Sequence, residues 1–422
     1  GPVQPPGQPA LDIDPRQKGL FLQRLESEVE SGPPELAARV GESLGGAEAD
    51  PGREAAPGRN RSRQLRAVDQ QIPPRSPRGL SHLHGHYKGN RCYFPVMSEE
   101  NRRFALAERP QGLIDENTFS LETGAVPEIG EGEALVRVKW ISIDPTNRTW
   151  IGEEPTYLPP VQIGETMRAL GLGEVIASYH ANYPVGSLVN GLTGWQDYTV
   201  ASDANPLMVV PDSAKDAPPA SLLGMLGMTG CTAYFGMLEI GEPKEGETVV
   251  VSAAAGAVGS VAGQLAKLKG ARVVGIAGGP EKCAWIIDEL GFDAAVDYKA
   301  DDWKAQLKEA TPNGIDVDFE NVGGEIMNQV FGRLNINARV ALCGLISGYN
   351  ATERPPDLTN FHKLLINRVK LQGFIILDYY ARFGEAIREL SGWVAEGKLT
   401  SEQTVVEGFE QLPHALNMLF KG

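Results

Sequence analysis

The segment that follows the apolar run Thr248–Ser252 carries the clearest chemical signal in the sequence. The run is typical of a buried strand, and the glycine-containing segment Ala253–Gly259 comes directly after it. In Ser260–Lys269 the apolar residues recur at helical spacing, and Arg272–Ala277 is typical of a second strand. Strand, glycine turn, helix and strand in this order form a βαβ unit of about 30 residues, as in dinucleotide-binding folds. The order therefore predicts a site for the pyrophosphate of a dinucleotide.

The turn contains the residues that such a site requires. Gly256 lets the backbone approach a pyrophosphate, and Gly259 lets the helix pack close to the strand. The free N–H groups at the start of the helix, together with the helix dipole, then face the phosphates. Ala253 replaces the first glycine of the usual fingerprint. A βαβ turn without any ligand is the alternative that remains open.

The end of the second strand bears on the choice of dinucleotide. NAD sites usually carry an acidic residue there, which holds the ribose hydroxyls. Here the chain continues as Ala277-Gly278-Gly279-Pro280-Glu281-Lys282. Small residues leave room for a 2′-phosphate and Lys282 supplies positive charge, so NADP fits better than NAD. Glu281 keeps NAD possible, and Lys282 could equally be an ordinary surface residue.

Strand-like and helix-like runs alternate from about residue 219 to residue 375. The strand-like runs after the first unit are Ile315–Phe319, Arg339–Cys343 and Lys370–Ile375. Such alternation predicts repeated βαβ units and a parallel sheet. We therefore assign residues 219–375 to an α/β domain of the Rossmann type that binds NADP.

The two regions before this domain differ from it and from each other. Residues 97–218 are β-rich. In Ala134–Trp140, apolar and basic residues alternate as in a half-buried strand, which favours a compact antiparallel, barrel-like domain. Residues 1–96 are rich in Pro, Gly, Arg, Glu and Ser, and we predict that they are disordered apart from one short helix at Gly19–Val29.

Composition disfavours several classes of protein. The formal net charge of -15 argues against a general role in binding nucleic acid. No run approaches the roughly 18 apolar residues of a membrane span, and no secretory signal is visible. The four cysteines are widely spaced, as expected of free thiols in a reducing compartment, so we expect a cytoplasmic protein.

Residues 97–422 lack the pattern of ligands that a zinc dehydrogenase needs. Such an enzyme uses Cys and His ligands around an open metal position. The cysteines and histidines of this region are scattered: Cys231, Cys283, Cys343, His180, His362 and His414. There is also no Gly-x-Ser-x-Gly nucleophile elbow. We expect hydride transfer without a metal, in which the cofactor supplies the reactivity.

Several further stretches make the chain recognisable. They are Ser142–Arg148, Gly227–Gly236, Ala253–Gly259, Glu281-Lys282, Asp297–Lys299, Glu320–Gly324 and Cys343–Asn350. Together they resemble the medium-chain dehydrogenase/reductase superfamily, and within it the zinc-independent branch of prostaglandin reductases, leukotriene hydroxydehydrogenases, alkenal double-bond reductases and bacterial curcumin reductase. The resemblance implies a GroES-like β-rich catalytic domain over 97–218, a Rossmann domain over 219–375, and a segment over 376–422 that returns to the catalytic domain.

The resemblance also implies roles on the cofactor side. The family's matching lysine and tyrosine make Lys282 and Tyr298 contacts of the 2′-phosphate. Ala254, Gly256 and Val258 lie in the matching pyrophosphate turn. Tyr298 taken alone could be a half-exposed aromatic residue at the end of a strand.

On the nicotinamide side, the resemblance implies that Met228 and Thr229 line the ring and that Asn321 lies beside the cofactor. Tyr349 matches a tyrosine near the nicotinamide and the substrate, and Tyr157 matches one on a loop over the pocket. Other roles remain open for some of these residues. Asn321 could simply form a turn, Met228 could belong to the core, and Tyr157 could serve packing.

The function implied is NADPH-dependent reduction of the activated carbon–carbon double bond of an enone or enal, by hydride transfer to the β-carbon in a homodimeric enzyme. An NADPH quinone reductase is one alternative. A non-catalytic NADPH-binding sensor or interaction protein, with residues 1–96 as its docking arm, is another. Family members continue past the motif that matches Phe420-Lys421-Gly422 into a final strand, so we expect this chain to be truncated before it.

Overall fold

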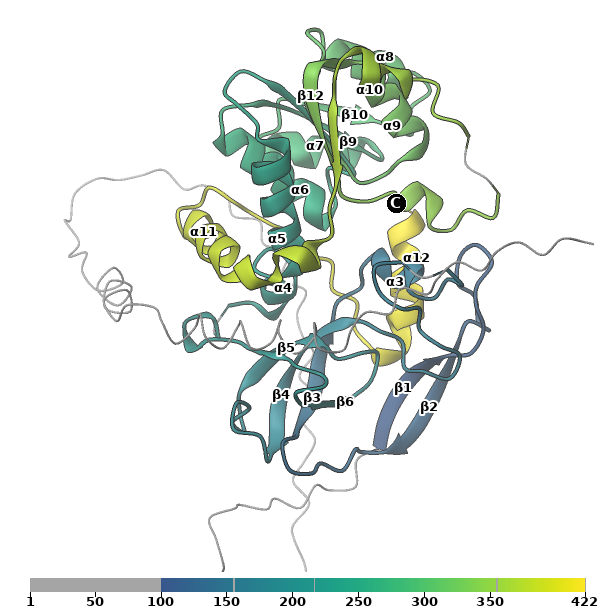
Figure 1. Cartoon of the computed structure of the whole chain (residues 1–422), viewed down its shortest axis with the longest axis vertical. Coiled ribbons are helices and arrows are strands. Elements are labelled where there is room, and N and C mark those ends of the chain that lie inside the picture. Colours follow the sequence, from purple (N-terminus) through teal and green to yellow (C-terminus); the bar gives the residue numbers. More distant parts are fainter. Residues whose placement is uncertain (1–99, 155, 216, 354–355, 422) are drawn as a thin grey trace, which may run out of the picture. The chain divides into compact units, whose positions relative to one another are not determined.

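The structure of the protein, a computed structural model, describes residues 100–154, 156–215, 217–353 and 356–421 (Figure 1). The predicted disordered extension 1–96, with its short helix, lies outside the described residues. Within the described ranges, no helix is long and apolar enough to cross a membrane.

A six-stranded parallel sheet forms the centre of the α/β region, as the alternating runs predict. Its order is β10-β9-β8-β11-β12-β13, and every neighbouring pair is parallel. The strands are β8 Thr248–Ser252, β9 Arg272–Ala277, β10 Ala294–Asp297, β11 Ile315–Glu320, β12 Leu334–Leu342 and β13 Lys370–Gly373. The chain reverses its direction of progress across the sheet between β8 and β11, and ligands of such sheets bind where the strands' carboxyl ends meet this point.

Helices cover the sheet and connect its strands. They are α5 Met228–Phe235, which continues as a π-helical turn η2 over Gly236–Gly241, α6 Ala257–Leu268, α7 Pro280–Asp288, α8 Trp303–Ala310, α9 Gly324–Phe331, α10 His362–Ile366 and α11 Phe383–Ala395. Short 3-10 turns are η1 Asp212–Ala214, η3 Ile346–Gly348, η4 Ile376–Arg382 and η5 Phe409–Gln411.

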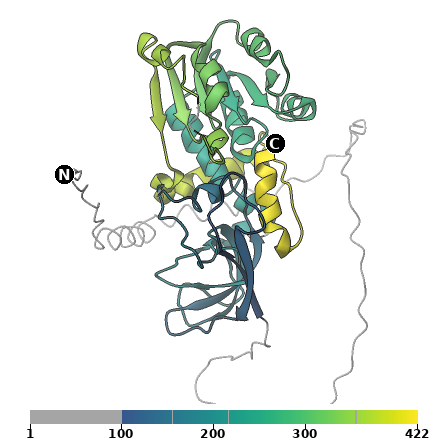
Figure 2. The same cartoon turned by 90° about the vertical axis from the view of Figure 1, so that its right-hand side faces the viewer.

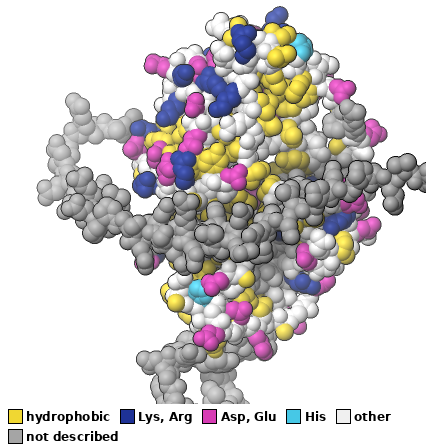
Figure 3. Space-filling view, in the orientation of Figure 1, with side chains coloured by type: hydrophobic (Ala, Val, Ile, Leu, Met, Phe, Trp, Pro, Cys, Tyr) yellow, Lys and Arg dark blue, Asp and Glu magenta, His cyan; other side chains and the backbone are white. Residues whose placement is uncertain are grey.

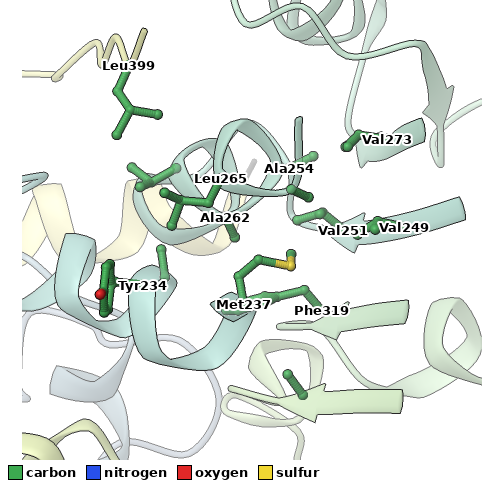
Figure 4. Packing of buried hydrophobic residues seen from close by; sticks show 14 of the residues in the cluster. Tyr234, Met237, Val249, Val251, Ala254, Ala262, Leu265, Val273, Phe319 and Leu399 are labelled. Atoms are coloured by element: carbon green, nitrogen blue, oxygen red, sulfur yellow. The ribbon is translucent and has the colours of Figure 1, made fainter. Parts of the chain in front are cut away.

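The main core lies between α5, α6 and the sheet (Figure 4). Val249 and Val251 of β8 point toward Leu265 of α6 and Phe319 of β11, and all four side chains are buried. Leu268, the last residue of α6, is 37% exposed. Burying a large aliphatic or aromatic side chain contributes about 1.5–3 kcal/mol, so this interface firmly fixes α6 and the turn before it.

Antiparallel strands form the β-rich region. A five-stranded sheet has the order β6-β3-β4-β5-β7, and β1 pairs with β2 in a separate two-stranded sheet. The strands are β1 Glu100–Leu106, β2 Phe119–Ala125, β3 Ala134–Ile141, β4 Leu170–Ser178, β5 Leu188–Leu192, β6 Tyr198–Ala201 and β7 Met208–Val209; the short helices are α3 Thr146–Thr149 and α4 Pro219–Leu223. The antiparallel arrangement is the one predicted, although the strands are divided between two sheets.

The last helix, α12 Leu412–Lys421, packs on the β-rich region (Figure 2). Leu416 is buried in the same cluster as Phe104 of β1, and the Phe409 ring just before α12 stacks on Phe104 at 5.3 Å between ring centres. Asn417 Nδ2 donates to the carbonyl oxygen of Ile114 at 2.8 Å. The C-terminal segment thus joins the β-rich region to the end of the α/β region.

Exposed hydrophobic side chains mark the surface near the outer strand β13 (Figure 3). Phe361, Leu365 and Ile366, in or next to α10, are 58%, 83% and 54% exposed. Apolar side chains gathered in this way are typical of a protein contact surface.

Candidate active site

The turn between β8 and α6 has a backbone that leaves almost no room for side chains. Ala253 has a left-handed φ of 49°, and Gly256 begins α6 as its N-cap. A Cβ atom on Gly259 would lie 2.4 Å from the carbonyl oxygen of Ala253, whereas one on Gly256 would lie 3.1 Å from it. Gly259 is therefore required for the close packing predicted from the sequence. The first N–H groups of α6, which have no partner within the helix, point out of this turn.

Two of the predicted turn residues have side chains that face inward. Ala254 is fully buried in the main core, and Val258 is partly buried against it. Any contact that Ala254 makes with a ligand in the turn therefore comes from its backbone. Gly256 itself is exposed.

The end of β9 forms a second recognition surface. A Cβ atom on Gly278 would lie 2.9 Å from Cε1 of the Tyr298 ring and 3.0 Å from Cε of Lys299, so both side chains lie over this glycine. Asp297 Oδ1 accepts hydrogen bonds from the N–H groups of Gly279 at 2.7 Å and Lys299 at 3.0 Å. The Asp297 carboxylate is thus engaged by the backbone, whereas Glu281 lies exposed in the first turn of α7.

Lys282 lies exposed in the first turn of α7, and among the described residues it has no ion-pair partner. Sequence reasoning placed Lys282 and Tyr298 here but missed Lys299, although the motif Asp297–Lys299 contains it. Lys299 lies over Gly278, and Lys282 is an exposed lysine in the helix that follows this glycine turn. Positive charge beside glycines suits a phosphate group.

Thr229 has a buried hydroxyl without a hydrogen-bond partner among the described residues. It lies at the second position of α5, after the N-cap Gly227. A buried polar atom without a partner costs about 1–3 kcal/mol, which a bound ligand would recover. Met228 beside it is partly buried and packs against the main core. This position fits both predicted roles of Met228, a core residue and a residue that lines the nicotinamide.

Asn321 follows β11 directly, and two hydrogen bonds hold it to β8. Its backbone N–H donates to Ser252 Oγ at 2.8 Å, and its side-chain Nδ2 donates to the Ser252 carbonyl at 2.7 Å. Asn321 lies in a bend, and both predicted roles, a turn residue and a neighbour of the cofactor, fit this position. Within the described ranges its Oδ1 accepts no hydrogen bond, so this oxygen remains available at the edge of the sheet.

Tyr349 follows the 3-10 turn η3 and is partly buried. Its hydroxyl oxygen accepts a hydrogen bond from the Leu345 N–H at 3.3 Å. A Cβ atom on Gly344 would lie 3.3 Å from both this hydroxyl and the Asn321 carbonyl, so the phenol lies close to the edge of the sheet. Burial raises the pKa of Tyr349 above its ordinary value of 10.0, and the nearby Tyr157 phenol raises it further. The hydroxyl is therefore protonated at neutral pH.

Tyr157 lies on a loop of the β-rich region and is 41% exposed. Its hydroxyl shares a short hydrogen bond with Thr146 Oγ1 of α3, and its ring meets Trp150 edge-on at 6.5 Å. Burial raises the pKa of Tyr157 as well. The hydrogen bond to Thr146 thus holds Tyr157 against α3.

Arg148 of α3, the helix whose Thr146 holds Tyr157, joins that helix to the loop that carries Tyr349. Its Nε donates to Asn350 Oδ1 at 2.9 Å, and its guanidinium also donates to the carbonyls of Pro110 and Gly112 at 3.1 Å. Burial lowers the pKa of Arg148. Sequence reasoning quoted the motif Ser142–Arg148 but assigned no role to Thr146 or Arg148, because their partners lie far away in the sequence.

The cysteines do not form a reactive or metal-binding cluster in the described part of the chain. Burial raises the pKa of the Cys231 and Cys343 thiols to about 12. In the same ranges, no group of three or more His, Cys, Asp or Glu side chains lies close enough together to hold a metal ion.

Comparison with known proteins gives two family matches. Residues 102–210 match the family described as the N-terminal domain of oxidoreductase, and residues 257–392 match the family described as zinc-binding dehydrogenase. The chain therefore belongs to the medium-chain dehydrogenase/reductase superfamily.

Individual relatives narrow this assignment. The chain is 45% identical over 329 residues to the NADPH-dependent curcumin reductase of Escherichia coli K12, covering 77% of this chain and 94% of the relative. It is 38% identical to prostaglandin reductase 1 of Rattus norvegicus, covering 76% and 96%. The crystal structure of CurA from Vibrio vulnificus in complex with NADPH is 44% identical, with a TM-score of 0.73 over 76% of this chain and 96% of that one. The chain is thus a member of the zinc-independent branch that contains these reductases.

Proposed function

We propose that the protein uses NADPH to reduce the carbon–carbon double bond of α,β-unsaturated ketones or aldehydes. The observation that carries the proposal is the hydrogen bond of Arg148 Nε to Asn350 Oδ1 at 2.9 Å, because it joins α3, where Thr146 holds Tyr157, to the loop that carries Tyr349. In our proposal, the protonated hydroxyls of these two tyrosines donate to the carbonyl oxygen of the substrate. The relatives whose names state a cofactor or an acceptor support the same reaction class.

The described residues fit NADPH. The turn before α6 accepts a pyrophosphate because Gly256 and Gly259 keep it free of side chains. Lys282, Lys299 and Tyr298 would hold the 2′-phosphate over Gly278. The unpartnered Thr229 hydroxyl and the Asn321 Oδ1 offer polar contacts on the nicotinamide side.

NADPH supplies the hydride in this chemistry. The hydride reaches the β-carbon of the substrate, and negative charge then develops on the carbonyl oxygen as an enolate. Tyr349 and Tyr157 would stabilise that charge by hydrogen bonding, because donors fixed in advance favour the charged transition state. A proton from water or from a tyrosine then completes the α-carbon.

The test follows the absorbance of NADPH and of NADH with 3-nonen-2-one and, in parallel, with a quinone as the acceptor. We expect turnover of the enone with NADPH, and loss of the preference for NADPH in Lys282→Ala. Losing one charge-assisted phosphate contact costs about 1.5–3 kcal/mol. This corresponds to roughly a 10- to 100-fold rise in KM for NADPH, whereas KM for NADH should not change. Lys269→Ala is the matched control, since Lys269 is an exposed lysine that follows α6.

Two results would contradict the proposal. Faster turnover of the quinone than of any enone would indicate a quinone reductase. Tight binding of NADPH without turnover of any acceptor would indicate a sensor or interaction protein.

We further propose that the enzyme is a cytoplasmic homodimer. The exposed hydrophobic residues Phe361, Leu365 and Ile366 near β13 support a contact between copies. Analytical ultracentrifugation would give twice the mass of the chain, and a monomer at micromolar concentration would contradict this. Cell fractionation tests the location.

A further inference from the structure

A fully buried carboxylate at the end of β11 joins several loops of the site. Glu320 is 0% exposed, and its Oε1 accepts hydrogen bonds from Ser252 Oγ at 2.7 Å, the Val322 N–H at 2.5 Å and the Gly323 N–H at 2.9 Å. These donors come from the end of β8 and from the turn that follows Asn321. One oxygen atom therefore binds two loops that both lead into the cofactor edge.

The backbone of the same residue reaches a third loop. The Glu320 carbonyl accepts hydrogen bonds from the N–H groups of Cys343 at 2.8 Å and Gly344 at 3.1 Å. These two residues begin the segment that carries Tyr349. The loops that start at Ser252, Asn321 and Cys343 are thus all tied to Glu320.

Stability alone does not account for this residue. Its second oxygen, Oε2, has no partner among the described residues, and neither oxygen of the fully buried Asp318 on the same strand has one. Burial raises the pKa of both carboxyl groups. Buried carboxyl groups without full partners cost free energy, and apolar residues of similar size would avoid that cost.

We propose that Glu320 is a positioning residue that sets the relative positions of the pyrophosphate turn and the Asn321–Gly323 turn. Ser252 Oγ is the intermediary, because it donates to Glu320 and accepts from the Asn321 N–H. Movement of Glu320 Oε1 therefore releases both turns at once. The proposal rests on the proposed function only in naming NADPH as the ligand that these turns position.

The test combines two measurements on the full chain. Hydrogen–deuterium exchange of the protein without cofactor reports the local opening of residues 321–324. Fluorescence titration with NADPH reports the dissociation constant. In Glu320→Ala, three donors lose their acceptor, so we expect exchange at residues 321–324 and the NADPH dissociation constant to rise by about tenfold or more. Glu320→Gln keeps an oxygen acceptor. In this variant, exchange at residues 321–324 and the NADPH dissociation constant should return most of the way to the wild-type values.

Asp316→Ala is the matched control. Asp316 lies at the other end of the same strand, where its carboxylate also joins neighbouring strands, through the Thr248 N–H at 2.9 Å and Asn335 Nδ2 at 2.7 Å. Asp316→Ala should lower the melting temperature. Exchange at residues 321–324 and the NADPH dissociation constant should stay at their wild-type values. If Glu320→Ala does not fold, Ser252→Ala removes the intermediary and should raise the same exchange rates and the dissociation constant.

Wild-type exchange at residues 321–324 in a folded Glu320→Ala or Ser252→Ala variant would overturn the proposal. Equal effects of Asp316→Ala at this turn would also overturn it, since they would show a general loss of stability. The exchange measurement needs no cofactor and no turnover, so failure of the proposed reaction would leave this test intact.

Discussion

The candidate site has a proposed cofactor half and a proposed substrate half, and the two are built in different ways. In the cofactor half, the backbone forms the turn between β8 and α6. Ala253 takes a left-handed conformation, and Gly259 packs where a Cβ atom has no room. In the substrate half, side chains form the site: Tyr157 is held by Thr146, and Arg148 joins Asn350 across 202 residues of sequence. Substitutions should therefore disturb this turn by steric conflict and the substrate half by the loss of individual hydrogen bonds.

The largest expected effect is on catalysis in the substrate half. Tyr349→Phe removes a hydroxyl donor, and we expect kcat to fall roughly 100-fold, as for the loss of one oxyanion-hole donor. The NADPH dissociation constant should stay unchanged. Because burial raises the pKa of Tyr349 above its ordinary value of 10.0, the wild-type kcat should also show no loss of this donor between pH 6 and pH 9. Steady-state kinetics across that range checks both points, and an unchanged kcat in the variant would remove Tyr349 from the mechanism.

Next comes a steric test of the cofactor half. In Gly259→Ala, the added Cβ atom would lie 2.4 Å from the Ala253 carbonyl oxygen. Relieving this clash requires the backbone to move, which costs free energy. Overpacking costs about 1–3 kcal/mol, so we expect the NADPH dissociation constant to rise about tenfold. Gly263→Ala is the control, since on the same helix it meets the Phe292 ring at 1.9 Å and should affect only the melting temperature. If both variants weaken NADPH binding equally, the turn has no special role.

A smaller effect tests the long-range contact between the two halves. Asn350→Ala leaves Arg148 without its side-chain acceptor, and a hydrogen bond to a charged group contributes about 1.5–3 kcal/mol at most. We expect kcat/KM for the enone to fall several-fold through displacement of Tyr349. The rate of NADPH binding, measured by stopped flow, should equal that of the wild type. An effect on NADPH binding alone would show that this contact serves the cofactor half.

The smallest expected effect concerns the core beneath both halves. Burial raises the pKa of Asp318 well above its ordinary range, so the folded state keeps a proton that the unfolded state loses above about pH 4. Stability from this group therefore falls as pH rises. Asp318→Asn cannot ionise, and we expect its melting temperature to exceed that of the wild type by a few degrees at pH 7, with a smaller difference near pH 4. Calorimetry at both pH values tests this, and a difference independent of pH would contradict it.

The contrast between the halves also explains how far the sequence could predict the structure. Strands β8 and β9 have the predicted bounds, because buried apolar runs and glycine turns are local signals. Strand β10 was missed, since Ala294–Asp297 is too short and too plain in composition to stand out. The contacts of Arg148 and Glu320 could not be predicted because each joins segments that only the fold brings together. Motif resemblance located Tyr157 and Tyr349 but could not supply the groups that hold them.

The central claim is that hydride reaches the β-carbon of an enone. The most direct measurement uses NADPH that carries deuterium at the transferred position of nicotinamide C4, with 3-nonen-2-one as the acceptor, and locates the label in the product by NMR. The proposed mechanism predicts a saturated ketone with deuterium on the β-carbon and none on the carbonyl carbon. Deuterium on the carbonyl carbon of an allylic alcohol would contradict it.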